Sequence, residues 1–94
     1  MEEVCYQLKL RAIPYETVSP QKLRGTCRIH NVEIQFEILS ESDYMYYRFK
    51  YGLTEVIIRK PRAEVQKNFA TIMSVLPTLI FDSDFSEARE QHSN

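Results

Sequence analysis

Aromatic and basic side chains that recur at every second position are the residues of this sequence best suited to bind a partner. They are Tyr44, Tyr46, Arg48 and Lys50 in one segment, with Arg24 and Arg28 in an earlier one. Tyrosine and arginine are enriched at the energetic centres of protein interfaces. Basic groups beside aromatic rings can also attract phosphates and stack bases. The pattern therefore predicts a binding surface, for a protein partner or for single-stranded nucleic acid.

The overall charge favours the protein partner. The chain has a net charge of −1 and a pI near 6.1, whereas a nucleic-acid module is typically basic on the binding side. Glu33 and Glu37 point outward from the predicted strand over residues 32–39. They therefore lie on the same outer face of the sheet as the basic residues of the neighbouring strands. We expect a small non-enzymatic protein-binding or regulatory module, with self-association as a homodimer among its interactions. A single-strand or RNA-binding module is the alternative.

Residue sets suited to catalysis or metal binding are sparse. Nucleophilic catalysis needs a nucleophile beside an oriented base, and the histidines are His30 and His92. His30 lies at a predicted turn, and Cys27 points to the opposite face of a regular strand. A structural zinc site needs four Cys or His ligands in paired spacings. We therefore expect no metal, no cofactor and no enzymatic activity, and a small enzyme of unknown class is the third hypothesis.

The two cysteines, Cys5 and Cys27, both fall within predicted strands. A disulfide requires Cα atoms roughly 4.4–6.8 Å apart, so it could form only if those strands were neighbours. The interpretation we favour is two reduced thiols, because disulfides are scarce in the cytosol.

Alternation of apolar and polar side chains indicates strands that bury one face. It predicts five strands, over residues 4–11, 22–30, 32–39, 44–51 and 53–60, with a surface loop over residues 14–21. His30-Asn31 and Gly52 suit tight turns, because asparagine and glycine tolerate positive φ. Gly25 suits a bulge or a close backbone approach. In the fourth strand, we expect Tyr47 and Tyr51 in the core and the other two tyrosines at the surface.

The hydrophobic period changes after Pro61. Apolar residues then recur at helical spacing, which predicts an amphipathic helix over residues 62–76 that begins after Pro61 and ends at Pro77. Residues 79–81 form a short apolar run, expected as an added edge strand or a packing segment. The predicted fold is α+β, an antiparallel meander of about five strands with one C-terminal helix packed on the sheet. We expect residues 1–81 to form the domain and residues 82–94 to form an acidic, mobile tail.

Length and composition fit one small domain with its own core. The chain has 94 residues, of which 44% are hydrophobic and 27% are charged. No apolar run approaches the roughly 20 residues of a membrane helix. Met1-Glu2-Glu3 is acidic and no apolar signal-peptide core follows. We expect a cytoplasmic protein that does not bind membranes.

Residues 8–15, 23–25 and 27–29 contain short strand-like segments in which arginine recurs beside small or apolar residues. Together they resemble a small cyanobacterial β-rich domain of unknown function, whose strands carry tyrosine-arginine-glycine boxes. The resemblance covers roughly the first third of the chain. Leu23 stands where the box has tyrosine, and Ala12 stands where the first box has glycine. The resemblance implies a β-rich fold and carries over no activity.

Overall fold

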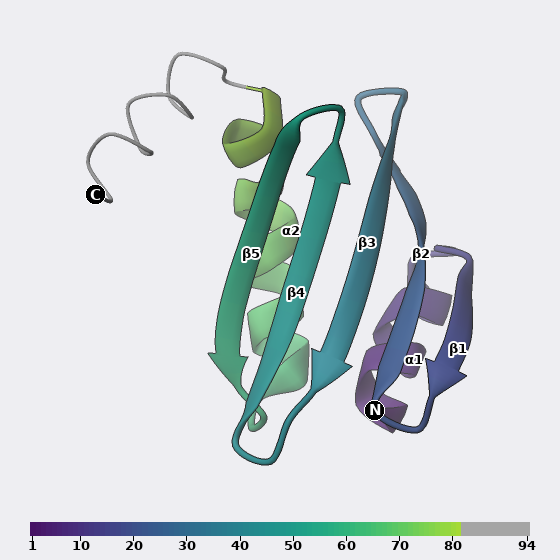
Figure 1. Ribbon diagram of the computed structural model, residues 1–94, viewed down its shortest axis with the longest axis vertical. Helices are drawn as coiled ribbons and strands as arrows, with labels where there is room; N and C mark the ends of the chain where they lie inside the picture. Colours follow the sequence, from purple (N-terminus) through teal and green to yellow (C-terminus); the bar gives the residue numbers. More distant parts are fainter. Residues whose placement is uncertain (82–94) are drawn as a thin grey trace.

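The computed structural model describes residues 1–81, which form an antiparallel five-stranded sheet and two helices (Figure 1). The elements, in chain order, are α1 (Glu2–Leu10), β1 (Tyr15–Ser19), β2 (Lys22–Ile29), β3 (Val32–Ser40), β4 (Tyr44–Tyr51), β5 (Thr54–Pro61) and α2 (Val65–Phe81). The strands lie side by side in sequence order. This confirms the predicted α+β meander with a C-terminal helix packed on the sheet. The predicted acidic tail lies outside the described residues.

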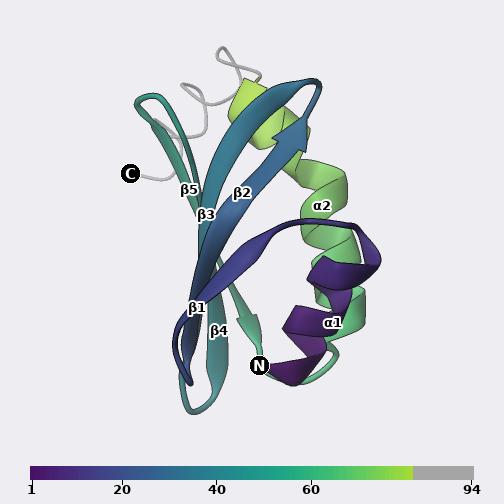
Figure 2. The same cartoon turned by 90° about the vertical axis from the view of Figure 1, so that its right-hand side faces the viewer.

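Both helices cover the same face of the sheet, and the opposite face has no helix over it among the described residues (Figure 2). The core lies between the sheet and the helices. From α2 it receives Phe69, Ile72, Leu76 and Ile80, all at most 4% exposed. Tyr47 of β4 is fully buried, and its ring meets the Phe69 ring edge-on at 6.2 Å. Among residues 1–81, neither helix covers the side chains of that face.

The strand predicted over residues 4–11 is wrong, because this segment is the helix α1. Its hydrophobic residues fit a period of two, but only Val4 and Leu8, one helical turn apart, are buried with Gln7. Tyr6 and Leu10, the other positions of the apparent strand face, are exposed. Glutamate, glutamine, leucine and lysine also favour a helix over a strand.

Polar contacts at helical spacing reinforce α1. Gln7 Nε2 donates to Glu3 Oε2 at 2.9 Å, and Arg11 Nη1 donates to Gln7 Oε1 at 2.6 Å. Residues four apart face each other only on a helix. The helix ends where Ala12 adopts a positive φ of 56° and Ile13 N–H donates back to the Leu8 carbonyl at 2.9 Å. This is a Schellman-type ending with alanine in place of the usual glycine.

The loop predicted over residues 14–21 is also wrong in part, because it contains β1. Tyr15, Thr17 and Val18 have the aromatic and β-branched side chains that suit a strand. β1 pairs with β2, with an irregularity between Thr17 and Ser19. The meander thus keeps five strands, but its first strand comes after the position predicted for it.

The helix predicted over residues 62–76 is correct in kind and displaced in its bounds. α2 begins at Val65, and it continues through Pro77 to Phe81, so the prediction that Pro77 ends it is wrong. A proline inside a helix removes one backbone hydrogen bond. Because the helix continues past Pro77, Ile80 is buried on the same apolar stripe as Leu76. The burial of Ile80 offsets the loss of the hydrogen bond. Residues 79–81, predicted as an added edge strand or a packing segment, are the last turn of α2 and pack on the core through Ile80.

Two predicted turns and one predicted close approach are confirmed. His30 and Asn31 both have positive φ, 53° and 64°, as a two-residue hairpin requires, and Gly52 has a φ of 59°. At Gly25, a side chain would meet the backbone of Pro14 and Tyr15. Within residues 1–81, no helix has the length and apolar character needed to cross a membrane.

Candidate functional site

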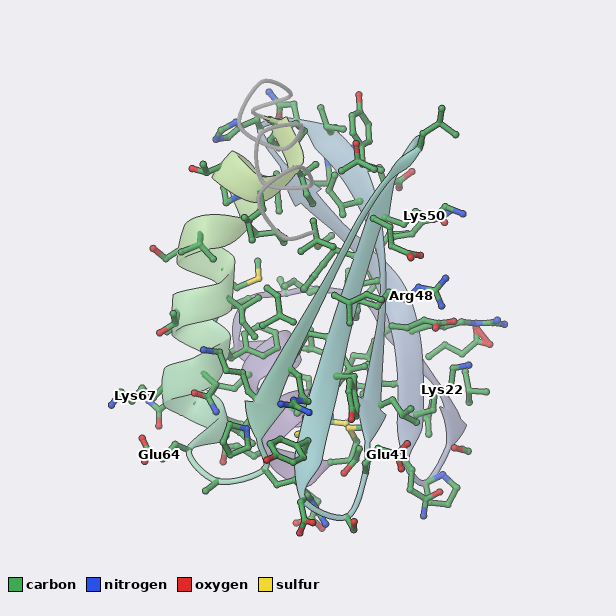
Figure 3. The ribbon with its side chains drawn as sticks, turned by 60° about the vertical axis from the view of Figure 1, so that its left-hand side comes forward. Lys22, Glu41, Arg48, Lys50, Glu64 and Lys67 are labelled. Atoms are coloured by element: carbon green, nitrogen blue, oxygen red, sulfur yellow. The ribbon has the colours of Figure 1, made fainter. Side chains whose placement is uncertain are left out.

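The face of the sheet away from both helices is the candidate binding surface, and we call it the open face. It is formed by the outward side chains of the strands, namely Glu16, Lys22, Arg24, Thr26, Arg28, Glu33, Gln35, Glu37, Leu39, Tyr44, Tyr46, Arg48, Lys50, Glu55, Ile57 and Arg59. All six residues predicted from the sequence lie on it. Figure 3 shows Lys22, Arg48 and Lys50 pointing away from α2.

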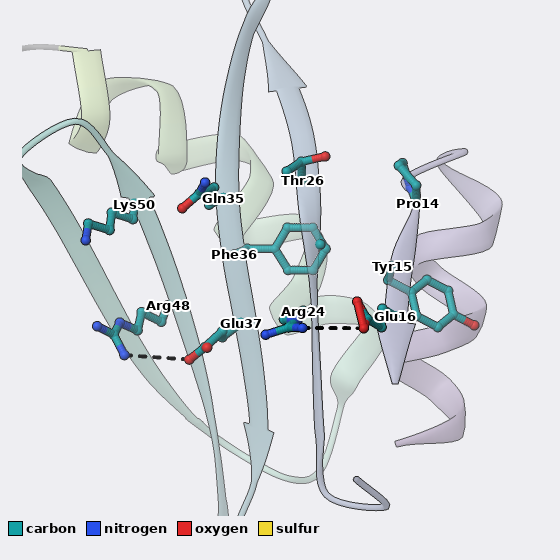
Figure 4. Close-up of a pocket in the computed structure, with 11 residues that line it drawn as sticks. Pro14, Tyr15, Glu16, Arg24, Thr26, Gln35, Phe36, Glu37, Arg48 and Lys50 are labelled. Atoms are coloured by element: carbon teal, nitrogen blue, oxygen red, sulfur yellow. Dashed lines mark hydrogen bonds and ion pairs between the residues drawn. The ribbon is translucent and has the colours of Figure 1, made fainter. Parts of the chain in front are cut away.

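A row of alternating charges crosses the middle of the open face. Glu16, Arg24, Glu37 and Arg48 are directly opposite one another on β1, β2, β3 and β4. Arg24 Nη2 lies 3.4 Å from Glu16 Oε1, and Arg48 Nη1 lies 3.6 Å from Glu37 Oε1 (Figure 4). Arg48 also reaches Glu55 Oε2 on β5 at 2.7 Å. We call the first four residues the charge row.

The charge row makes both arginines members of ion pairs within the chain. Exposed cross-strand pairs of opposite charge contribute about 0.2–1 kcal/mol each. The row therefore aligns the four strands in register and leaves little free positive charge at Arg24 and Arg48. Sequence reasoning identified both arginines but not their partners Glu16 and Glu55. Glu16 fell in a predicted loop, and Glu55 lies opposite Lys50 and reaches Arg48 diagonally across β4 and β5.

The open face is hollowed over β1 to β4, where a depression of about 600 Å³ lies beside the charge row (Figure 4). Its wall on one side is the segment from Pro14 to Glu16, and its opposite side carries Arg48 and Lys50. Gly25 and Phe36, which lie opposite each other on β2 and β3, also contribute to the lining. The depression is large enough for several side chains of an extended peptide.

The row next to the charge row differs in having polar groups that are not held in ion pairs. Thr26, Gln35 and Lys50 are direct cross-strand neighbours on β2, β3 and β4, and all three line the depression. Lys50 is exposed, and its ammonium group makes no ion pair with the described residues. It is therefore the cation of the depression that is available to an anionic group of a ligand.

Tyr44 and Tyr46 lie at the other end of β4 and do not line the depression. The guanidinium carbon of Arg59 lies 4.4 Å from the centre of the Tyr44 ring, a cation–π contact. Tyr46, half-buried, lies between Leu39 of β3 and Arg59 of β5. The aromatic pair therefore packs on its cross-strand neighbours.

The remaining predictions about single side chains have mixed outcomes. Arg28 is at the far end of the open face, where Nη2 donates to the Asn31 carbonyl at 3.0 Å. Tyr47 is buried as predicted, but Tyr51, expected in the core, is 42% exposed. It lies near the end of α2, with its ring centre 5.7 Å from that of Phe81. The structure thus brings Arg24, Arg48 and Lys50 together and leaves the tyrosines and Arg28 apart.

The groups best suited to nucleophilic chemistry do not converge. Cys27 is buried, and burial raises the pKa of its thiol to about 11, which disfavours the reactive thiolate. His30 stacks on Phe81 with ring centres 5.4 Å apart. Cys5 is on α1, and neither cysteine is in a disulfide. Within residues 1–81, no three histidine, cysteine or carboxylate side chains are grouped as metal ligands.

The buried thiol predicts a loss of stability at high pH. The unfolded chain releases the Cys27 proton near its ordinary pKa of 9, whereas the folded chain holds it until about pH 11. Folding is therefore fully supported below pH 9 and loses about 2–3 kcal/mol as the pH rises through 11. Urea unfolding at about pH 8 and pH 10.5 measures this loss. Cys27→Ala should remove most of the dependence between these values, and a parent chain equally stable at both would contradict it.

The chain was compared with protein-family models, with curated proteins and with solved structures, and none of them matches it.

Proposed function

We propose that the protein is a non-enzymatic binding module that holds an acidic segment of a partner protein in the depression of the open face. The observation that carries the proposal is Lys50. It lies at the edge of a hollow of about 600 Å³ without an ion-pair partner among the described residues, whereas Arg24 and Arg48 are paired. A carboxylate entering the depression would meet this ammonium group and the polar side chains of Thr26 and Gln35.

The charge row favours a protein segment over a nucleic acid. A phosphate backbone needs a continuous basic track, but Glu16, Glu37 and Glu55 interrupt the basic residues across the sheet. A phosphate moving along the row would approach a glutamate at every second strand. The tyrosines, which could stack bases, lie outside the depression and one of them carries Arg59 on its ring. An extended peptide with separated acidic side chains matches this pattern better.

Binding of an acidic peptide should depend on Lys50. A fluorescent peptide of alternating glutamate and serine serves as the probe, and Lys50→Glu should weaken its binding by about tenfold or more, since it replaces attraction with repulsion. Lys9→Glu, an equal change of charge on an exposed side chain of α1, is the matched control and should have little effect. Fluorescence anisotropy gives both affinities, and amide NMR shifts should locate the peptide at Thr26 and Gln35.

A single-stranded oligo-dT of equal charge distinguishes the two kinds of partner. The proposal requires the peptide to bind more tightly than the oligonucleotide at moderate salt, because phosphate contacts weaken steeply as salt rises. The peptide-binding proposal fails if Lys50→Glu and Lys9→Glu reduce peptide binding equally. It also fails if the oligonucleotide binds more tightly than the peptide and Arg28→Glu abolishes binding of the oligonucleotide.

A further inference from the structure

Among residues 1–81, β5 is an edge strand, and the backbone groups on its outer side have no strand to pair with. It pairs only with β4 in the described part of the chain. Arg62 N–H donates to the Asp43 carbonyl at 3.2 Å, just beyond the last register pair, Tyr44 with Pro61. Hydrogen-bonded and non-bonded pairs alternate along an antiparallel ladder. Since Asp43 and Arg62 form a hydrogen-bonded pair, the pairs that contain Glu55, Ile57, Arg59 and Pro61 are the non-bonded ones. The backbone N–H and C=O groups of Glu55, Ile57 and Arg59 therefore point away from β4, toward the free edge, as does the C=O group of Pro61.

The middle of this edge is apolar and exposed. Ile57 is 59% exposed on the open face, and its neighbours Val56 and Ile58 are half-buried on the helix side. Edge strands normally resist pairing through charges, prolines or bulges along their length. In β5 such residues stand toward the ends, with Glu55 near one end and Arg59, Lys60 and Pro61 at the other, and none lies in the middle of the strand. Three consecutive β-branched apolar residues, beside the outward backbone groups of Glu55, Ile57 and Arg59, form a pairing site for another strand.

The side chains of β5 are complementary to those of β5 in a second copy of the chain, when the two strands are related by a two-fold axis that passes beside Ile57. In an antiparallel pair centred there, Ile57 faces Ile57 of the other copy, and Glu55 faces Arg59. Val56 faces Ile58 on the helix side, where apolar surface would join apolar surface. Residues 55, 57 and 59 are those whose backbone groups point outward. They form three pairs between the two copies, and each pair exchanges two hydrogen bonds, so the interface has about six.

Other two-fold registers lack this agreement. Centring on Glu55 or on Arg59 sets like charges opposite each other, which is destabilising. Centring on Ile58 sets Ile57 against Arg59 and Glu55 against Pro61, which has no N–H to donate. Centring on Val56 sets Ile57 against Glu55. Ile57 is therefore the centre at which hydrogen bonding, charge and apolar contact all agree.

We propose that the protein forms a two-fold homodimer in which two β5 strands pair in antiparallel fashion about Ile57. The two five-stranded sheets then join into one continuous sheet, with both open faces on the same side. Glu55 would lie between Arg48 of its own chain, already 2.7 Å away, and Arg59 of the second copy. A closed two-fold pairing also removes an edge that would otherwise recruit further chains. Lys50 lies opposite Glu55 within its own chain and has no counterpart in the second β5, so the pairing does not rest on the peptide-binding proposal.

Ile57→Pro tests the pairing without breaking the β4–β5 ladder, because the N–H of Ile57 does not serve that ladder. Sedimentation equilibrium of the full chain should show a dimer of the parent and at least about a tenfold weaker dimer of Ile57→Pro. Val18→Asp, a change at an exposed residue of the opposite edge strand, is the control and should leave the dimer intact. A parent that stays monomeric at about 1 mM overturns the proposal.

Charge exchange gives a second test that does not depend on how well a proline is tolerated. Glu55→Arg and Arg59→Glu should each weaken the homodimer, since each sets like charges opposite each other twice. Mixed together, the two variants restore both opposite-charge pairs and should form a heterodimer. A mixture that remains monomeric overturns the proposed register. A parent dimer that persists in Ile57→Pro but dissociates in Lys50→Glu overturns it too, and places the interface on the open face.

Discussion

Replacing Phe69 with alanine should lower the free energy of unfolding by about 3–5 kcal/mol, because the ring fills the centre of the space between α2 and the sheet. The side chain is 3% exposed. Its ring meets Tyr47 edge-on at 6.2 Å, and the guanidinium carbon of Arg11 lies 4.9 Å from its centre. Truncation would leave a cavity that borders the sheet and the end of α1 at once. For a domain of this size the loss approaches the whole stability.

Urea unfolding followed by circular dichroism measures this loss. Val75→Ala is the matched control, since Val75 lies on the same helix but is 41% exposed, and it should cost well under 1 kcal/mol of stability. If Phe69→Ala and Val75→Ala unfold at the same urea concentration, α2 does not depend on Phe69 for its packing. A change in the slope of the transition would instead indicate that the variant has lost cooperative folding.

The sequence predicted the fold where its hydrophobic period was unambiguous. Along β2, β3 and β4 the alternation is uninterrupted, and these strands lie close to their predicted bounds. In α1, Val4, Tyr6, Leu8 and Leu10 satisfy the period of a strand, although the contacts from Glu3 to Gln7 and from Gln7 to Arg11 require a helix. Both periods fit a segment this short, so tertiary packing decided between them.

The part of the candidate site that could be predicted is the part that follows from the alternation of apolar and polar side chains along the strands. Alternation placed Arg24, Arg48 and Lys50 on one side of the sheet, but it contains no information on register. Only the register brings Glu16, Arg24, Glu37 and Arg48 into one row and sets Lys50 between Gln35 of β3 and Glu55 of β5, whose carboxylate is paired with Arg48. The prediction of a basic face therefore overestimated its free positive charge, because it did not place each acidic residue opposite a particular basic one.

The close approach at Gly25 links the fold to the site. A Cβ atom there would lie closer to the Pro14 carbonyl oxygen than the sum of the van der Waals radii allows, and it would lie 2.9 Å from Phe36 Cζ and 3.0 Å from Tyr15 Cα. Two of these neighbours belong to backbone, which cannot rotate away as a flexible side chain can. β1 therefore packs tightly across Gly25, and this contact holds the wall of the depression in place.

Gly25→Ala should accordingly cost about 3 kcal/mol or more, the upper end of the range for overpacking, because β1 has to move away from β2. Gly52→Ala is the control, since Gly52 has a positive φ of 59° and nothing within 4 Å of an added Cβ; its cost should be the conformational penalty alone, about 1–2 kcal/mol. Urea unfolding of the two variants therefore separates steric overlap from backbone strain. Equal losses would contradict the close approach. A larger loss in Gly25→Ala, accompanied by weaker binding of the acidic peptide, would show that the glycine maintains both β1 and the depression that β1 encloses.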